Sequence, residues 1–417
     1  EFLSDVLDQS DEKNIGETIT KIIEVKDDLI EDVVDNLSDK DNTFIISSTS
    51  DQVVAVKEKI FETIVSKETI KSAEVLSKVM SKSDEGTVDA VINNITEKNT
   101  NKDSTLSLKV MADFSEKSPE KLEQLSETNA DQVEKLTIDA VQKATTSSED
   151  VDLIAKVVAV TNDKIVNIVV EEVSKTSTEE KQNLSAKVLK AIVDTQPNKI
   201  EIINNDVKDI MIKQTVESAK NQKEGTGIQD EQDLTAIVSD IIVNTDTQTA
   251  SKIINEVNNT QTETNLSLEI ISGISQKDTA KLSILSENNK EQIETLTEKA
   301  VENAENTAED SQLIANVVSV VSDDLANKVV EEVSKVAIDE KQSFSVKVLK
   351  AIVDTEPEKI EIINEEIKEN LIEQAIEATI DQQEGNLIEE ENLTDAVSEI
   401  IVKTDTNTAA KVIEQIN

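Results

Sequence analysis

Residues 345–364 read "SVKVLKAIVDTEPEKIEIIN", and residues 185–204 read "SAKVLKAIVDTQPNKIEIIN". Seventeen of the twenty positions are identical at an offset of 160 residues. Apolar residues in this block recur at i, i+4, i+5, i+7 and i+8, as at Leu184, Val188, Leu189, Ala191 and Ile192. This is the spacing of an amphipathic helix and not the alternation of a strand. The block therefore predicts a helical unit that the chain uses more than once.

The repetition extends beyond this block. Residues 153–175 match residues 313–335 at the same offset, and a half-period of about 80 aligns "LSAKVLKAI" (184–192) with "LSLEIISGI" (266–274). Within one unit we expect five short helices, at about 151–161, 164–175, 179–194, 197–204 and 206–221. The connectors are polar and short, so successive helices should be antiparallel neighbours. Recurring polar breaks exclude one long coiled coil.

The predicted fold is all-α: an elongated α-solenoid of short antiparallel helices in repeats of about 80 residues, paired into super-repeats of about 160. Five units follow from this period and form one continuous solenoid, and they cover residues 1–98, 99–175, 176–258, 259–335 and 336–417. The first unit has an extra segment at about 43–67. Two interpretations stay open for it: one additional helix at about 52–66, or a docking element that grips another subunit.

Prolines and glycines occur at fixed repeat positions. Pro119, Pro197 and Pro357 share one position, which predicts the first turn of a helix, where the missing N–H costs nothing. Gly225 and Gly385 share another position just after a helical stretch, as helix-terminating glycines do. The pair Gly225 and Gly227 lacks the GK[ST] of a phosphate-binding loop, so we interpret it as a linker.

Short Ser/Thr and Asp patterns predict helix starts. Ser177-x-x-Glu180 and Thr355-x-x-Glu358 have the form of capping boxes. The segments "SDEGT", "TDTQT" and "TDTNT" recur at one repeat position and offer oxygen ligands, at 83–87, 245–249 and 404–408. They lack the alternating acids, central glycine and final glutamate of an EF-hand, so we expect helix caps and not a calcium site.

The charge and the missing residue types exclude several functions. The chain has 417 residues, 87 acidic and 42 basic residues (all of them lysine), a net charge of −45, and no Cys or His. Such a chain repels nucleic acid, so we expect no nucleic-acid partner. No stretch is apolar enough for a membrane span. Diffuse screening by divalent cations is the only metal interaction that we expect.

The chain lacks the residue types on which most catalytic sites depend. Without His, Cys or Arg there is no catalytic triad, thiolate site or arginine clamp, and pairs among 87 acids are too common to be informative. We therefore predict that the protein is not an enzyme and has no catalytic, cofactor-binding or metal-binding residues. The glutamates of "VVEEVSK" (169–175 and 329–335) should form a solvated face, each paired with the lysine four positions on.

The sequence predicts a structural protein. We expect a subunit or segment of an extended filament or surface fibre, a homo-oligomer or polymer built by head-to-tail stacking of repeats. An extracellular or cell-surface location is favoured. The residues expected at the contact are apolar and lie near the two ends of the sequence and in the extra segment: Phe2, Leu3, Phe44, Ile45, Ile46, Val412, Ile413 and Ile416.

The alternative is a solenoid scaffold that binds protein partners on a concave face. The two hypotheses differ in what they require of the surface. A scaffold should have a face with non-repeating residues, whereas a fibre should keep its residues repetitive on all faces.

Overall fold

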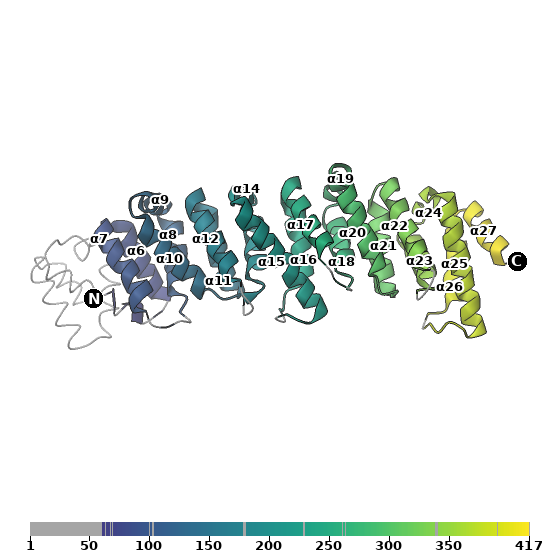
Figure 1. Cartoon of the computed structure of the whole chain (residues 1–417), viewed down its shortest axis with the longest axis horizontal. Coiled ribbons are helices and arrows are strands. Elements are labelled where there is room, and N and C mark those ends of the chain that lie inside the picture. The colour runs from purple at the N-terminus through teal and green to yellow at the C-terminus, as the bar shows by residue number, and fades with distance from the viewer. Residues whose placement is uncertain are drawn as a thin grey trace, which may run out of the picture. The chain divides into compact units, whose positions relative to one another are not determined.

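A computed structural model describes residues 61–417 except 63, 67, 69, 100, 102, 103, 178–180, 228, 229, 261, 263, 338–340, 390 and 417; for 71, 82 and 416 it describes the backbone alone. The chain forms two compact units, Glu1–Ile210 and Met211–Asn417. The described residues are helical and contain no β-strand (Figure 1). The predicted all-α class is confirmed.

From residue 70 on, the helices of the first unit are α6 (Ile70–Lys82), α7 (Glu85–Asn93), the π-helix η1 (Asn94–Lys98), α8 (Leu106–Lys117), α9 (Pro119–Thr128), α10 (Ala130–Lys143), α11 (Ser148–Val160), α12 (Asp163–Thr176), α13 (Leu184–Thr195) and α14 (Lys199–Ile202), as far as the structure describes them. The boundary between the units lies inside α15 (Asn205–Glu224).

The helices of the second unit are α16 (Leu234–Asn244), α17 (Thr247–Asn259), α18 (Leu266–Lys277), α19 (Thr279–Asn288), α20 (Lys290–Glu302), α21 (Ala308–Val320), α22 (Asp323–Val336), α23 (Phe344–Thr355), α24 (Lys359–Ile362), α25 (Glu365–Glu384), α26 (Leu393–Lys403) and α27 (Thr406–Ile416).

Each unit has two layers of helices. In the first layer, α6, α8, α11 and α13 pack in succession in one unit, and α16, α18, α21, α23 and α26 in the other. In the second layer, α7 with η1, α10 and α12 follow one another in one unit, and α17, α20, α22, α25 and α27 in the other (Figure 1). The short helices α9, α14, α19 and α24 connect the first layer to the second. This alternation is the architecture of an α-solenoid.

Helix lengths repeat with the predicted period. α13 and α23 have 12 residues each, α14 and α24 have 4, and α15 and α25 have 20. α8 and α18 also agree at 12, and α9 and α19 at 10. Five helices recur about every 80 residues, as expected from the sequence.

The core is aliphatic and lies between the two layers. α23 buries one side of nearly its whole length, through Phe344, Ser345, Val346, Val348, Leu349, Ala351, Ile352 and Val353. Some buried serines in the first layer are satisfied within their own helix; Ser115 Oγ donates to the Ala112 carbonyl at 2.8 Å, and Ser275 Oγ to that of Ser272 at 2.7 Å. These bonds offset the cost of burying a hydroxyl.

The predicted aspartate caps are confirmed. Asp246 Oδ1 accepts hydrogen bonds from the backbone N–H of Gln248 at 2.7 Å and of Thr249 at 3.0 Å, at the start of α17. Asp405 caps α27 in the same way, and Asp84 accepts the N–H of Thr87 at the start of α7. Local sequence is sufficient for these caps because donor and acceptor are two or three residues apart.

The prolines and glycines agree with the sequence in most respects. Pro119 is the first residue of α9, and Gly225 and Gly385 follow α15 and α25 with φ of +67° and +79°. Pro197 and Pro357 instead lie in turns, two residues before α14 and α24 begin. The first-turn prediction is wrong for these two, because the connector makes a turn before the four-residue helix starts.

The capping box predicted at Thr355 is wrong. Thr355 is the last residue of α23, and its Oγ1 donates to the Ala351 carbonyl at 2.7 Å. Ser177 directly follows α12, and its Oγ lies 2.8 Å from that of Ser185. Residues 178–180, which complete the other predicted box, lie outside the described residues, so that box stays a prediction. In a chain rich in Ser, Thr and Glu, the four-residue pattern arises frequently without the backbone geometry that a box requires.

Only a part of the predicted extra segment is described. Residues 61, 62 and 64–66 are helical, and Phe61, Ile64 and Val65 are buried. The rest of 43–67, with "TFIISST", lies outside the described residues, so its docking role stays a prediction. In the part of the chain that is described, no helix is both long enough and apolar enough to cross a bilayer.

Candidate functional site: a groove between α22 and α25

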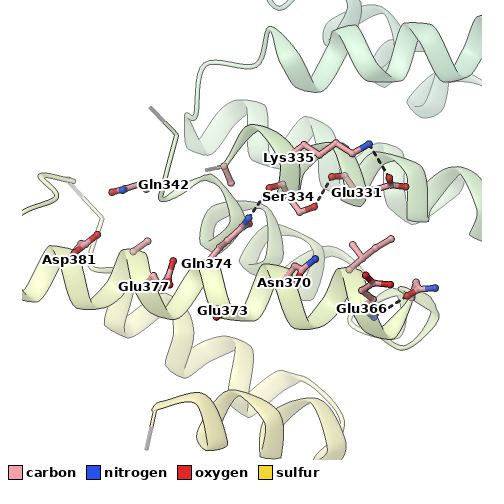
Figure 2. A pocket seen from close by; sticks show the side chains of 14 residues that line it. Glu331, Ser334, Lys335, Gln342, Glu366, Asn370, Glu373, Gln374, Glu377 and Asp381 are labelled. Carbon is pink, nitrogen blue, oxygen red and sulfur yellow. Dashed lines mark hydrogen bonds and ion pairs between the residues drawn. The ribbon is translucent and has the colours of Figure 1, made fainter. Parts of the chain in front are cut away.

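A groove of about 710 Å³ lies between two neighbouring helices of the second layer, α22 and α25 (Figure 2). α22 contributes Glu331, Ser334 and Lys335. One face of α25 contributes a long row of polar side chains, namely Glu366, Asn370, Glu373, Gln374, Glu377 and Asp381 (Figure 2). The groove lies wholly within the second unit.

The polar side chain of Gln374 connects α25 to both neighbouring helices. Gln374 Nε2 donates to the Ser334 carbonyl on α22 at 2.8 Å (Figure 2). Its Oε1 accepts from Ser345 Oγ on α23 at 2.6 Å. The opposite face of α25 is anchored in the core, where Leu371 and Ile372 are buried. The groove-lining side chains therefore project from a helix that is held in place on two sides.

The groove is strongly acidic. Lys335 is the one lysine among the described residues that line it, and its Nζ lies 3.0 Å from Glu331 Oε1 and 2.6 Å from Glu332 Oε1. Hydrogen bonds to Glu332 and Glu331 raise the pKa of Lys335, and its hydrogen bond lowers the pKa of Glu331. The lysine therefore stays charged at neutral pH, and its charge is directed at α22.

Acids on the other side of α25 have partners that the groove acids lack. Lys411 of α27 forms ion pairs with Glu365 and with Glu369, the latter at 2.7 Å. Within the described part of the chain, no salt bridge connects a lysine to the four carboxylates that α25 contributes to the groove: Glu366, Glu373, Glu377 and Asp381. Their charge faces the groove uncompensated.

α25 is the helix in which the two halves of the chain differ most plainly. Residues 365–384 share only six of twenty identities with 205–224, whereas the preceding window, 345–364, shares seventeen with 185–204. α15 has four acids and four lysines, and α25 has seven acids and one lysine. At three groove positions α15 has Ile210, Lys213 and Asn221, where α25 has Asn370, Glu373 and Asp381.

Two of the residues predicted for self-association have described side chains. Val412 is 2% exposed and packs beside Leu349, Ile372 and Val397 in its own unit. Ile413 is 49% exposed. The side chain of Ile416, like the whole of Phe2, Leu3, Phe44, Ile45 and Ile46, lies outside the described part of the chain. Self-association through these residues stays a prediction.

The "VVEEVSK" segments are only partly a solvated face. The lysine pairs are confirmed, with Lys175 Nζ 2.8 Å from Glu171 Oε1 and the equivalent pair of α22 at 3.0 Å. Glu172, however, is only 6% exposed, and its Oε1 accepts from Gln142 Nε2 at 2.7 Å. The prediction is wrong for Glu172 because α10 covers it, and no local pattern shows which helix will lie there.

Sequence reasoning missed a second role of lysine. Lys164, Lys199 and Lys359 donate to backbone carbonyls at the ends of other helices. The acceptors are Ser126 at 2.7 Å, Thr161 at 2.7 Å and Val321 at 3.2 Å. A cation at a helix C-terminus is favourable because the last carbonyls are unpaired and carry partial negative charge. Each pair is 38 residues apart, a spacing for which the sequence offers no signal.

The described residues contain no arrangement of three or more acids that would hold a metal ion. The glycine pair after α15 has a structural role: the N–H groups of Thr226 and Gly227 both donate to the Asn221 carbonyl, at 2.9 and 3.2 Å. These amides therefore terminate the helix, as the linker interpretation predicts.

The two layers of repeating helices define the chain as an all-α helical-repeat protein, an α-solenoid. Neither a protein-family model nor a curated protein sequence matches it.

Several solved structures resemble the fold. A crystal structure of a Kap121p mutant is 9% identical with a TM-score of 0.37; the match covers 100% of this chain, which spans about half (52%) of the Kap121p chain. Human Puf-A is 10% identical with a TM-score of 0.33, over 99% of this chain and 94% of that one. A circular tandem repeat protein is 14% identical with a TM-score of 0.23, over 99% and 95%. The likeness concerns the helical-repeat fold alone.

Proposed function

We propose that this chain is a helical-repeat scaffold that binds a partner protein in the groove between α22 and α25. One observation carries the proposal: α25, which lines the groove, keeps six of twenty residues of the other copy, while the α23–α24 window directly before it keeps seventeen of twenty. Three of the changed positions line the groove, at Asn370, Glu373 and Asp381. A fibre is expected to keep its exposed faces repetitive, whereas a scaffold can vary the face that its partner contacts.

The groove also has the features of a recognition surface. It is about 710 Å³ in volume, within the range of binding clefts, and the charged side chains that the firmly anchored α25 presents to it are all carboxylates. A rigidly held α25 favours affinity, because little conformational entropy of the groove is lost when the partner binds. Such a surface supports binding rather than catalysis.

Selection from a random 12-residue peptide library displayed on phage tests the proposal. The full chain serves as the target, and single peptides are then measured against two variants. Asn370→Trp fills the middle of the groove without changing the charge. Asn198→Trp places the same bulk on an exposed asparagine of the first unit. We expect Asn370→Trp to weaken selected peptides about tenfold or more, equal to about 1.4 kcal/mol, and Asn198→Trp to leave them unchanged.

Peptides that bind both variants equally well, or a library that yields no binder to the full chain, would contradict the groove as the binding site. The circular dichroism spectrum of each variant shows that the helices are intact.

Filament assembly is the second candidate, and one observation favours it. Ile413 of α27 is 49% exposed, whereas its repeat equivalent in α17, Ile254, is fully buried. α17 is covered by α20, so a second copy packed against α27 would bury Ile413 in the same way. The exposure of Ile413 therefore supports the head-to-tail stacking expected from the repeat.

Native mass measurement at rising protein concentration tests assembly. We expect oligomers that grow with added salt, because salt screens the repulsion between chains of net charge −45. Ile413→Lys should abolish them, while Ile284→Lys, at a site of similar exposure (45%) on α19, should not. A monomer at all concentrations would refute the filament and leave the scaffold proposal intact.

A further inference from the structure

We infer that the occupant of the groove is a basic segment of the partner, with lysine or arginine at every second position of an extended chain. This inference rests on the proposed function and specifies the chemistry of its ligand. It follows from the charge, the spacing and the internal pairing of the groove residues.

The charge of the groove requires a cation from outside the chain. The lysines near α25 are already engaged: Lys335 with Glu331 and Glu332, and Lys411 with Glu365 and Glu369. A lysine or arginine of a partner would therefore meet carboxylates that no other lysine neutralises. Complementary charge speeds the encounter and disfavours neutral or acidic partners.

The spacing of the acids favours an extended partner. Glu373, Glu377 and Asp381 are four residues apart along α25, which gives steps of about 6 Å at the rise of an α-helix. Side chains on one face of an extended chain repeat every two residues, or about 6.6 Å. Three successive basic side chains of an extended segment can therefore lie opposite three successive carboxylates.

The equivalent helix of the other repeat, α15, lacks such a row. α15 has Lys213 and Asn221 at the positions of Glu373 and Asp381, which breaks the acidic row. α15 also balances its charges, with four acids and four lysines. Of these two equivalent helices, α25 should therefore bind the basic segment and α15 should not.

Fluorescence polarisation with a labelled 12-residue peptide of alternating Lys and Ser tests the inference. The groove variant Glu373→Gln with Asp381→Asn is compared with Glu356→Gln plus Glu358→Asn. Both remove two negative charges from the full chain, and the control acids are exposed and lie outside the groove. The control changes also reproduce Gln196 and Asn198 of the other repeat, where they are tolerated.

We expect the groove variant to weaken the peptide about 2- to 30-fold, since each exposed ion pair contributes modestly. The control should change affinity less than the groove variant. Both variants have the same net charge and therefore the same long-range attraction for the peptide, but only the groove variant removes carboxylates that would contact it. Binding should weaken as salt rises, and an alternating Glu–Ser peptide should not bind.

Equal weakening by both variants would overturn the inference, because it would reduce the interaction to overall charge. The inference would also be overturned by neutral library peptides whose binding is lost in Asn370→Trp and does not depend on salt concentration. In that case the proposed binding site would stand. A Lys–Ser peptide that binds at full strength to Asn370→Trp would contradict both.

Discussion

Two adjacent windows of the second unit differ in how many residues they share with the other copy. Residues 345–364 form α23, α24 and the turn between them, and they keep seventeen of twenty residues of the other copy. Residues 365–384 form α25 and keep six. The first window is buried between layers along α23, whereas α25 has one buried face and one face toward the groove.

The difference shows where the fold tolerates change. On the buried face of α25 the substitutions are conservative, such as Leu371 for Met211 and Ile376 for Val216. On the groove face they reverse or create charge, as at Glu373 and Asp381. Volume and polarity are constrained by close packing in the core, and exposed charge is not. Three substitution experiments test this contrast, in order of falling effect.

The largest effect should follow from truncating the conserved window. Phe344 is fully buried at the start of α23, so Phe344→Ala should lower the free energy of unfolding by about 3 to 5 kcal/mol through lost burial and a cavity. Phe344→Leu installs the residue found at position 184 and should cost less than about 1.5 kcal/mol. Urea unfolding measures both. Similar losses in the two variants would contradict the account of a shared core.

An intermediate effect is expected at an ion pair in the loop after α25. Glu389 Oε2 lies 2.8 Å from Lys347 Nζ, with side chains 15% and 10% exposed, and the other repeat has Gln229 at this position. Burial by itself raises the pKa of Glu389, but hydrogen bonds from Lys347 and Ser343 outweigh it, so the pKa lies below its ordinary value. Glu389→Gln should cost roughly 1.5 to 3 kcal/mol at pH 7.

The pH dependence of this loss has a definite sign. Because the pKa of Glu389 is lower in the folded state, the pair stabilises the protein above the unfolded pKa of about 4.3, and this contribution disappears as pH falls through the folded pKa. The difference between wild type and Glu389→Gln should therefore shrink in acid. Glu358→Gln, at an exposed position, is the control. A difference that stays constant from pH 7 to acid would show that charge is not responsible.

The smallest effect on stability should come from the divergent groove face. Asn370→Ile, Glu373→Lys and Asp381→Asn together install the side chains of α15 and should change the free energy of unfolding by less than about 0.5 kcal/mol per position. Ala186→Val installs the residue at position 346 in a fully buried site of α13 and should cost about 1 to 3 kcal/mol. If the three groove substitutions lower the free energy of unfolding as much as Ala186→Val does, the groove face of α25 contributes to stability, which would contradict the contrast between the two windows.

Local features were predicted well. The helical class, the period, the caps at Asp246 and Asp405 and the terminators Gly225 and Gly385 are all confirmed. The capping box at Thr355 failed, because a threonine in the last turn of a helix satisfies itself on the preceding carbonyl. The sequence indicated the groove only indirectly, through the drop in identity between the two copies that begins at residue 365.

The sequence by itself determined the helices and their caps, because these signals depend on residues that are one or two helical turns apart. It also determined the repeat, through identities at an offset of 160 residues. Only the tertiary structure decided which charges are neutralised. Lys411 reaches Glu369 across 42 residues, Lys199 reaches the Thr161 carbonyl across 38, and Glu373 meets no lysine at all among the described salt bridges. Electrostatic pairing depends on distance in space, and helix packing sets that distance. The block at 345–364 is thus part of the frame, and the acidic face that follows it is the site that we propose.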